Sequence, residues 1–244
     1  MAGRPGRVEG AVIPLDTSVV VETAALVAAQ TEMNGSADAE GPGVVKRLAA
    51  AWQSMAPGLH AVQSKKCAYR EDLLKERSSE VDHVRPKQIY WWLAFKLRNL
   101  LYACRSCNNA KSSKWALQAG VLPLAPRDEP WDVPEPAMLV DPTVDDPDVH
   151  LTFVQRGGEW RIAGQTDRGI WTITNLELDR DSFTRDSNWI ATEVLTPEVA
   201  RLKAAIVSGD AGAYEESRRR LERWAGPDNR YSQFVRTVVE QLMA

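Results

Sequence analysis

Cys-Ala-Tyr-Arg at residues 67–70, Val-Asp-His-Val-Arg-Pro-Lys at 81–87 and Asn-Leu-Leu-Tyr-Ala-Cys-Arg-Ser-Cys-Asn-Asn-Ala-Lys at 99–111 form the stretch that decides the fold. The stretch holds an acid beside a histidine, an asparagine sixteen residues later, and a second asparagine directly after a Cys-x-x-Cys pair. These residue types are typical of a small metal-binding nuclease centre. We therefore expect the rest of the chain to be built around this stretch.

The overall composition predicts a folded protein with no membrane partner. The chain has 244 residues, of which 44% are hydrophobic, and a chain of this length buries a sizeable core as one elaborated domain or two small ones. The sequence has no apolar run near the roughly 20 residues that a membrane-spanning helix needs, and no signal-peptide core follows its first residues. We expect a soluble, cytoplasmic protein.

The charge is distributed unevenly along the chain. The net charge is −3, but residues 61–114 carry twelve Lys and Arg against five Asp and Glu, a local charge of +7 that leaves −10 for the remainder. Basic residues concentrated around a motif are expected of a surface that binds phosphate groups. Because a run of charge is also typical of a merely solvated face, the motif itself has to decide between the two interpretations.

The hydrophobic pattern and the turn residues predict an α+β protein that is mostly helical, with a small additional β element. Residues 122–136 hold five prolines and are expected to form an ordered linker or a wrapping loop. Residues 151–155 and 159–163 are expected to pair as a hairpin, and residues 172–176 to form a further short strand or strand-like turn. Helices are predicted over 16–32, 43–55, a segment that starts near 179, 197–208, 211–225 and 229–243.

These elements divide the chain into four regions. Residues 1–16 contain Gly and Pro and are expected to be poorly ordered. The predicted regions are an N-terminal helical region (1–60), a nuclease-like core (61–120), a Pro-rich loop with a small β element (121–190) and a C-terminal helical region (191–244).

The residue types in the motif stretch suit the hydrolysis of a phosphodiester bond. That reaction needs a general base for water and a divalent cation held by hard ligands. His83 is the natural base, and Asp82 and Asn108 offer oxygen ligands that suit Mg²⁺ or Mn²⁺. Asn99 is placed to help fix the His83 tautomer or the backbone around it. Because adjacent strand residues point to opposite faces, Asp82 and His83 are expected at a strand end or in a turn before Pro86.

The motif resembles that of the HNH endonucleases of the ββα-metal superfamily. The resemblance rests on Asp82-His83-x-x-Pro86, Asn99-Leu100 and Cys104-x-x-Cys107-Asn108-x-x-Lys111. In that family the His is the general base, the preceding Asp and the residue after the second Cys bind the divalent ion, and the middle Asn supports the His. Asn108 stands where many members have a final His. The resemblance implies a ββα finger over residues 67–115 and a metal-dependent endonuclease acting on nucleic acid, with DNA favoured.

A narrower resemblance covers roughly residues 60–185 and extends more weakly into the C-terminal helices. Its blocks are Lys66-Cys-Ala-Tyr, His83-x-Arg-Pro-Lys, Tyr90-Trp-Trp-Leu-Ala, Asn99-Leu-Leu, Asp145-Asp-Pro-Asp-x-His150 and Arg168-Gly-x-x-Thr172-Ile. In this order they are similar to the HNH subunit of bacterial antiphage systems of the Septu and retron-associated type. This resemblance implies phage defence by nucleic-acid cleavage together with an ATPase partner.

The sequence departs from the HNH pattern at one position. The family has two Cys-x-x-Cys pairs that hold a structural Zn²⁺, whereas the first pair here reads Cys67-Ala-Tyr-Arg70. Structural zinc sites are nearly always four-coordinate and Arg is no zinc ligand, so Cys67, Cys104 and Cys107 are expected to leave the zinc site empty or weakly filled. The alternative fourth ligands are the next two acids, Glu71 and Asp72. The aromatic residues expected to stabilise the finger by packing instead are Tyr69, Trp91, Trp92 and Tyr102.

Several other residues have both a functional and a structural interpretation. Trp91 and Trp92 are expected in the core, although such a pair also stacks on bases in single-strand binders. His150 fits a turn that closes onto the core better than it fits a group near the metal or the substrate. The residues expected to contact phosphates, some of which will only be solvated, are Arg85, Lys87, Lys111 and Lys114.

Two alternative functions stand beside the endonuclease. The first is a catalytically retired HNH-fold subunit that binds nucleic acid or assembles with partners, with Arg70 in place of Cys as its first sign of decay. Retention of the acid, the His and both Asn residues argues against it. The second is an HNH scaffold repurposed for a small-molecule reaction, which the sequence does not favour but which fold alone does not exclude. Such an enzyme would need a closed cavity.

Overall fold

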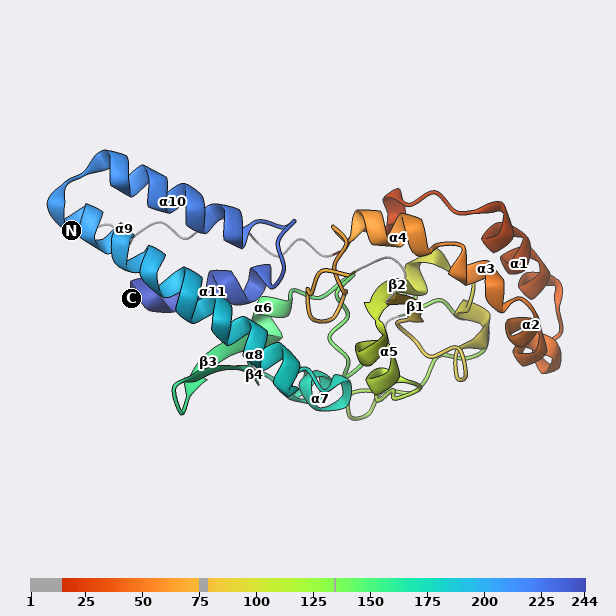
Figure 1. The fold of residues 1–244 in the computed structure, drawn as a ribbon. Coiled ribbons are helices and arrows are strands. Elements are labelled where there is room, and N and C mark those ends of the chain that lie inside the picture. The colour runs from red at the N-terminus through yellow and green to blue at the C-terminus, as the bar shows by residue number, and fades with distance from the viewer. Residues whose placement is uncertain (1–14, 75–78, 134) are drawn as a thin grey trace.

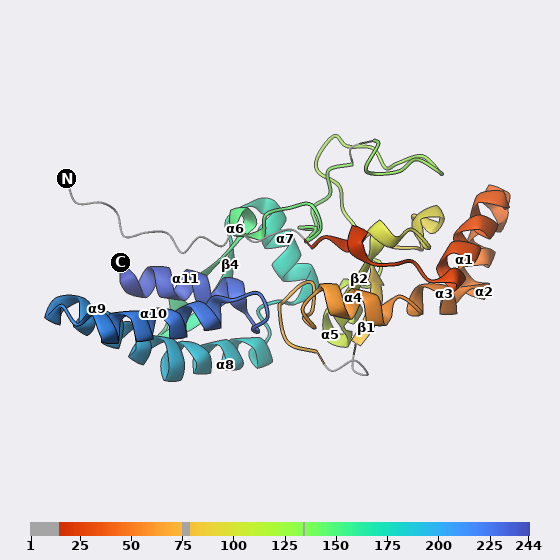
Figure 2. The same cartoon turned by 90° about the horizontal axis from the view of Figure 1, so that it is seen from above.

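The structure is a computed structural model, and it describes residues 15–74, 79–133 and 135–244. Over these ranges the protein is α+β and mostly helical, with two separate two-stranded antiparallel sheets, which confirms the predicted fold class. N-terminal helices form one end of the elongated molecule and C-terminal helices the other (Figures 1 and 2). The sheet of β1 (Ser79–His83) and β2 (Leu100–Cys104) lies beside the first, and the sheet of β3 (Leu151–Arg156) and β4 (Glu159–Gly164) beside the second. None of the described helices is long and apolar enough to cross a membrane.

The N-terminal helices are shorter and more broken than the sequence predicts. Asp16 caps only a single turn of 3₁₀ helix, and the first α-helix starts after Thr23, whose hydroxyl accepts from the Leu26 amide. The predicted helix over 43–55 is interrupted at Leu48, which leaves the helical region of backbone angles. A further helix runs through Pro57, which a first helical turn tolerates. The elements are α1 (Ala24–Gly35), α2 (Gly41–Arg47), α3 (Ala49–Gln53), α4 (Ala56–Val62) and 3₁₀ turns at Thr17–Val19 and Asp38–Glu40.

The motif stretch folds as two strands followed by a helix. Strand β1 (Ser79–His83) pairs antiparallel with β2 (Leu100–Cys104), so that His83 lies opposite Leu100. Helix α5 (Arg105–Lys111) follows β2 directly, and the Cys104 sulfur caps it by accepting from the Cys107 amide. Between the strands lie 3₁₀ turns at Trp91–Leu93 and Leu97–Asn99. The order β1, β2, α5 is that of a ββα unit.

The Pro-rich segment wraps around the N-terminal half of the molecule. Its described residues between 122 and 136 form turns and extended chain without a helix or strand. The Trp92 indole donates to the Asp128 carbonyl at 2.7 Å, and Arg127 donates to the Ser36 carbonyl at 2.6 Å. The buried Glu135 carboxylate pairs with Arg85 at 2.9 Å. These contacts confirm the predicted wrapping loop.

The second sheet confirms the predicted hairpin but not the strand after it. β3 (Leu151–Arg156) pairs with β4 (Glu159–Gly164) across Gly157 and Gly158, both of which have positive φ. Residues 172–176, predicted as a strand or strand-like turn, instead complete helix α7 (Asp167–Leu176). Its buried positions are spaced three and four residues apart, so the helical face that packs on the core overrides the strand preference of the β-branched residues.

The C-terminal helices close the chain. Helix α8 (Asp181–Trp189) begins where the sequence predicts a helix and continues through a π-helical turn at Ile190–Leu195. The other elements are α6 (Pro147–His150), α9 (Thr196–Ser208), α10 (Ala211–Ala225) and α11 (Ser232–Met243). Helices α9 and α10 form an antiparallel hairpin that lies farthest from the β1–β2 sheet (Figure 1).

Three apolar clusters fill the interior of the described chain. One joins α1 to α4 with the aromatic turn that contains Trp91 and Trp92, which are 9% and 6% exposed; their predicted place in the core is confirmed. A second joins β3 and β4 with helices α8 to α11. The third lies between them and contains the three cysteines together with residues of β2, β3 and α7. The ββα unit is thus supported from both sides.

Candidate functional site

His83 lies at the end of β1 with its ring turned into the protein. It is 3% exposed, and its Nε2 lies 3.0 Å from the Ala94 carbonyl oxygen. Since a carbonyl oxygen only accepts, Nε2 carries the ring proton and Nδ1 carries the lone pair. The edge of Trp52 packs against the ring with centroids 5.0 Å apart. The structure therefore holds His83 in the tautomer whose Nδ1 can accept a proton.

The surroundings keep the His83 ring neutral. Burial, together with the positive charges of Lys87 and Lys111, lowers the pKa of His83 to about 3. Burial disfavours the charged imidazolium, and each nearby cation disfavours it further. At neutral pH the ring is therefore a proton acceptor rather than a donor at Nδ1.

Asp82, the neighbour of His83 on β1, faces a different set of partners. It is 5% exposed, and its Oδ2 accepts from the Tyr69 hydroxyl at 2.6 Å. The Lys111 ammonium lies 3.1 Å from Oδ2 and 3.3 Å from Oδ1, and it also donates to the His83 carbonyl at 2.5 Å. β1 ends at His83, as expected for this pair, yet the carboxylate faces α5 while the imidazole faces Trp52 and Ala94.

Asn108 lies on α5 and faces the same side of β1 as Asp82. Its Nδ2 donates to the Glu80 carboxylate at 2.6 Å, and Arg105 pairs with the same carboxylate at 3.0 Å. Glu80 is two residues before Asp82, so both acids point towards α5. Within the described chain, no hydrogen bond joins Asn108 to Asp82 directly. The sequence interpretation missed Glu80, although the two-residue spacing from Asp82 is a signal that could have identified it.

The oxygen donors on this face suit the divalent ion that the sequence predicts. Glu80 and Asp82 offer carboxylate oxygens from β1, and Asn108 offers an amide oxygen from α5. Hard oxygen ligands of this kind are those that Mg²⁺ and Mn²⁺ prefer. The chemistry of the donor set therefore fits the predicted ion, and Lys111 is the cation that contacts Asp82 in this structure.

Asn99 supports the backbone around His83 rather than its ring. The side chain is 2% exposed, and its Oδ1 accepts from the Arg85 amide at 2.8 Å. Its Nδ2 donates to the carbonyls of Arg85 at 3.1 Å and Leu93 at 3.2 Å. Asn99 thereby joins the chain after His83 to the Trp91–Leu93 turn. The residue after that turn, Ala94, accepts the hydrogen bond from the His83 ring.

The structure separates the four predicted phosphate-binding residues into two pairs. Lys111 is 0% exposed and contacts Asp82, and Arg85 pairs with the buried Glu135, so these two are committed to internal partners. Lys87 is partly exposed, with its ammonium 5.5 Å from the Trp52 ring centroid, and burial lowers its pKa. Lys114 is exposed and donates to a backbone carbonyl. Only Lys87 and Lys114 remain available for a phosphate group.

The three cysteines gather beneath the ββα unit. The Sγ atoms of Cys67, Cys104 and Cys107 lie within 4.8 Å of one another, and all three residues are buried. Burial raises the pKa of Cys67 to about 11, whereas thiol hydrogen bonds from Cys107 and Cys67 lower the pKa of Cys104. The cluster can therefore stabilise one thiolate and offers three of the four ligands that structural zinc requires.

Arg70 stands at the position of the missing fourth cysteine. Arg70 pairs with Asp72, and Asp72 pairs in turn with Arg230 at 3.0 Å. The Glu71 carboxylate accepts from the Ser232 hydroxyl and the Gln233 amide at the start of α11. These contacts engage Glu71 and Asp72, the alternative fourth ligands, with Arg230 and the start of α11.

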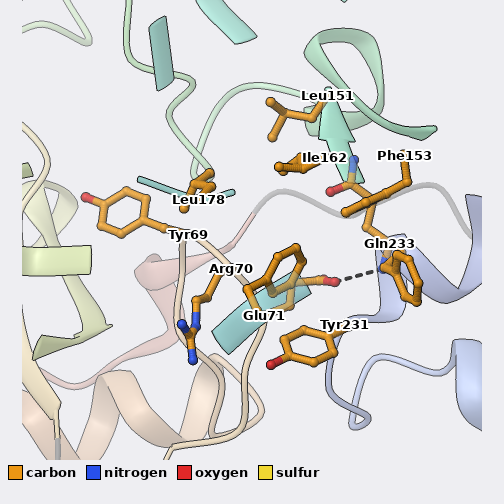
Figure 3. A pocket seen from close by; sticks show the side chains of 11 residues that line it. Tyr69, Arg70, Glu71, Leu151, Phe153, Ile162, Leu178, Tyr231 and Gln233 are labelled. Atoms are coloured by element: carbon orange, nitrogen blue, oxygen red, sulfur yellow. Dashed lines mark hydrogen bonds between the residues drawn. The ribbon is translucent and has the colours of Figure 1, made fainter. Parts of the chain in front are cut away.

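A small cavity lies between the 69–71 segment and the second sheet (Figure 3). Glu71 and Gln233 line it beside apolar side chains of β3, β4 and α11. Its volume is about 30 Å³, which is room for about one water molecule. This cavity has no space for a small-molecule substrate, so it gives no support to a repurposed small-molecule enzyme.

His150 belongs to a separate polar cluster around the start of α7. Its Nδ1 lies 2.8 Å from the hydroxyl of Thr166, the residue that caps α7. Arg168 bonds to the Leu139 carbonyl at 2.8 Å and pairs with Asp145. These contacts close the 141–150 segment onto α7, which is the structural role that the sequence favours for His150.

The chain is similar to two proteins named Septu protein PtuB. It is 29% identical over 146 residues to that of Bacillus mycoides (strain KBAB4), which covers 53% of this chain and 48% of the relative. It is 29% identical over 121 residues to that of Bacillus thuringiensis, which covers 49% of this chain and 38% of the relative. The chain thus spans less than half the length of these curated relatives.

No protein-family model and no solved structure matches the chain. The relationship therefore rests on the two similarities of sequence. Together they relate the chain, over about half its length, to the Septu protein PtuB.

Proposed function

We propose that the chain is a metal-dependent HNH endonuclease that hydrolyses phosphodiester bonds in nucleic acid, with DNA as the favoured substrate. The observation that carries the proposal is the buried hydrogen bond from His83 Nε2 to the Ala94 carbonyl. This bond leaves the Nδ1 lone pair of a neutral imidazole free on the residue that follows Asp82 in β1. A neutral imidazole with a free lone pair has the protonation state that a general base needs before it takes a proton from water.

The chain's own residues would divide the work between them. His83 would take a proton from water at Nδ1 and retain its Nε2 bond to Ala94 throughout. Asp82 and Asn108 would hold Mg²⁺ or Mn²⁺, which when bound would neutralise charge on the phosphate and the leaving oxygen. Asn99 would hold the turn before Ala94 in place by donating to the Leu93 carbonyl. The Ala94 carbonyl would thereby stay aligned with the imidazole.

The remaining basic groups would position the nucleic acid. Lys87 extends past Trp52 beside His83 and is partly exposed, and Lys114 is exposed just after α5. Contacts of this kind to phosphate supply affinity that falls with salt and carry no sequence information. Asp82 and His83 are only 5% and 3% exposed, so a phosphate group would reach them only after the side chains that cover them move aside.

We also propose a role in antiphage defence with a partner subunit. The support is the similarity to proteins named Septu protein PtuB, together with the motif blocks that resemble the HNH subunit of Septu and retron-associated systems. That resemblance assigns an ATPase as the partner. The burial of His83 and Asp82 supports a nuclease that is active only together with its ATPase partner.

The test is cleavage of plasmid, linear single-stranded DNA and total RNA with Mg²⁺ or Mn²⁺. We expect the protein, with an ATPase subunit from the same gene neighbourhood added, to cut at least one of these substrates, and Asp82→Asn to abolish the cutting. Which of the three is cut identifies the substrate as double-stranded DNA, single-stranded DNA or RNA. If all three substrates stay intact with the partner and either metal present, the endonuclease proposal is wrong.

One observation favours a second candidate, an HNH-fold subunit without catalysis. The Lys111 ammonium already neutralises Asp82 inside the protein, which a retired metal site could retain for stability alone. Calorimetry with Mn²⁺ separates the two candidates. Binding that is lost in Asp82→Asn supports the nuclease, and undetectable binding supports the retired subunit.

A further inference from the structure

Lys111 is the most unusual charged residue of the described chain. It is the last residue of α5 and is 0% exposed, whereas lysine is almost never fully buried without a charged partner. Its ammonium contacts both oxygens of Asp82, at 3.3 and 3.1 Å, and the His83 carbonyl at 2.5 Å. Three acceptors therefore satisfy its three protons.

These contacts place Lys111 at the carboxylate where the proposed metal would bind. Asp82 is a candidate ligand, and Asn108, another of the candidates, lies three residues before Lys111 on the same helix. Residues three apart share one face of a helix. Asp82 would hold the ion together with Asn108, so the ion and the Lys111 ammonium would share the same carboxylate.

Charge makes the two cations compete. A buried carboxylate paired with an internal ammonium has little negative charge left for a second cation, and like charges in a weakly solvated site repel strongly. Tyr69 also donates to Asp82 Oδ2, but it is neutral and adds no repulsion. Lys87 adds a further positive charge on the His83 side. The charges of Lys87 and Lys111 both lower the pKa of His83.

We infer that Lys111 is an internal competitor of the divalent cation for Asp82 and sets the metal affinity of the site. This inference rests on the metal site of the proposed function and adds its regulation. Asp82 would have to give up its contact with Lys111 to hold a metal, while the bond to the His83 carbonyl would keep the ammonium within the site. Lys111 thereby keeps the metal affinity of the site low.

The experiment measures Mn²⁺ affinity by calorimetry and Mn²⁺-induced stabilisation by thermal unfolding, without any cleavage assay. Lys111→Gln keeps a hydrogen-bond donor but removes the charge. We expect it to bind Mn²⁺ about tenfold or more tightly than the wild type, because removing an adjacent charge shifts such equilibria by about one to three log units. Its melting temperature should be lower without metal and rise more steeply with Mn²⁺.

Two controls keep the outcomes distinct. Lys203→Gln removes the same charge from the exposed face of α9 and should leave Mn²⁺ affinity unchanged, and Asp82→Asn should abolish binding. If the wild type binds Mn²⁺ through Asp82 and Lys111→Gln binds it no more tightly, the competition is refuted while the metal site stands. If Lys111→Gln is too unstable to titrate, the same comparison is made with Lys111→Met by Mn²⁺-dependent melting. Absence of Mn²⁺ binding in all proteins would overturn the metal site and the competition together.

Discussion

Replacing Asn99 by Asp changes a single atom in the support of the proposed base. The amide oxygen that accepts from the Arg85 amide is kept, because aspartate retains an oxygen at that position. The amide nitrogen that donates to the Arg85 and Leu93 carbonyls becomes a second oxygen that cannot donate. Asn99→Asp therefore removes the tie between the chain after His83 and the turn that leads to Ala94, without removing volume.

The magnitude follows from the two lost bonds. Each buried hydrogen bond is worth about 1 kcal/mol, and leaving a buried acceptor unpaired costs about 1–3 kcal/mol. Asn99 is 2% exposed, so the new carboxylate faces two carbonyl oxygens with little water. We expect the free energy of unfolding to fall by about 2–4 kcal/mol. We also expect kcat for cleavage to fall about 10–100-fold, as for other groups that orient a site residue, and KM to change little.

Urea unfolding and cleavage kinetics measure the two effects. Asn34→Asp is the matched control, because Asn34 is exposed near the end of α1 and uses its oxygen to accept from Gln30; we expect it to change stability by no more than about 1 kcal/mol. An Asn99→Asp protein with the stability and the kcat of the wild type would refute the positioning role. A loss of stability without a loss of kcat would limit Asn99 to a purely structural role.

Three further predictions concern the rest of the candidate site. Glu135→Ala should lower the free energy of unfolding by about 3–5 kcal/mol, because it leaves Arg85 without its buried partner. Glu159→Ala, which removes an exposed ion pair with Arg161, should lower it by less than about 1 kcal/mol. Equal losses of the two variants in urea unfolding would contradict the buried role of Glu135. Lys87→Gln and Lys114→Gln should each reduce the slope of log affinity for nucleic acid against log salt by about 1, and unchanged slopes would place the nucleic acid elsewhere. Zinc analysis should find well under one ion per chain, and EDTA should move the melting temperature by less than about 2 °C, since the described residues contribute three thiols and no fourth ligand to the cluster; a full zinc equivalent would show that a fourth ligand exists.

Local sequence signals predicted much of the fold correctly. Helix α10 spans the predicted residues 211–225, bounded by the cap Asp210 and by Gly226. The β3–β4 hairpin follows from alternating residues on either side of two glycines. In both places the capping or turn residue and the hydrophobic pattern agree, which is the condition under which local reasoning succeeds.

Local reasoning failed where tertiary packing overrode a local preference. Thr172 and Ile173 favour a strand, but they lie on the buried face of α7, which Thr166 caps. Tyr231 has positive φ and donates its amide to the Glu71 carbonyl, so α11 begins later than the predicted residue 229. The partner residues that decide these cases are distant in sequence, and no local window contains them.

The candidate site was identified from sequence as a set of residue types, but the geometry among them was not. Asp82 and His83 on β1 and Asn108 on α5 belong to one ββα unit, but the Asp82 carboxylate faces α5 while the His83 ring faces Trp52. The partners of those residues were not predicted, because the Asp82 contacts to Tyr69 and Lys111 depend on how α5 packs on β1. A lysine expected on the surface therefore proved to be the most buried charge of the site.

The most direct test of the central claim is the cleavage rate of His83→Ala against the wild type, with Mn²⁺ and the partner subunit present. The account predicts that the wild type cuts nucleic acid and that the variant, folded by circular dichroism, cuts about 10²–10⁴-fold more slowly, the usual contribution of a general base. If His83→Ala cuts as fast as the wild type, His83 is not the base and the account is wrong.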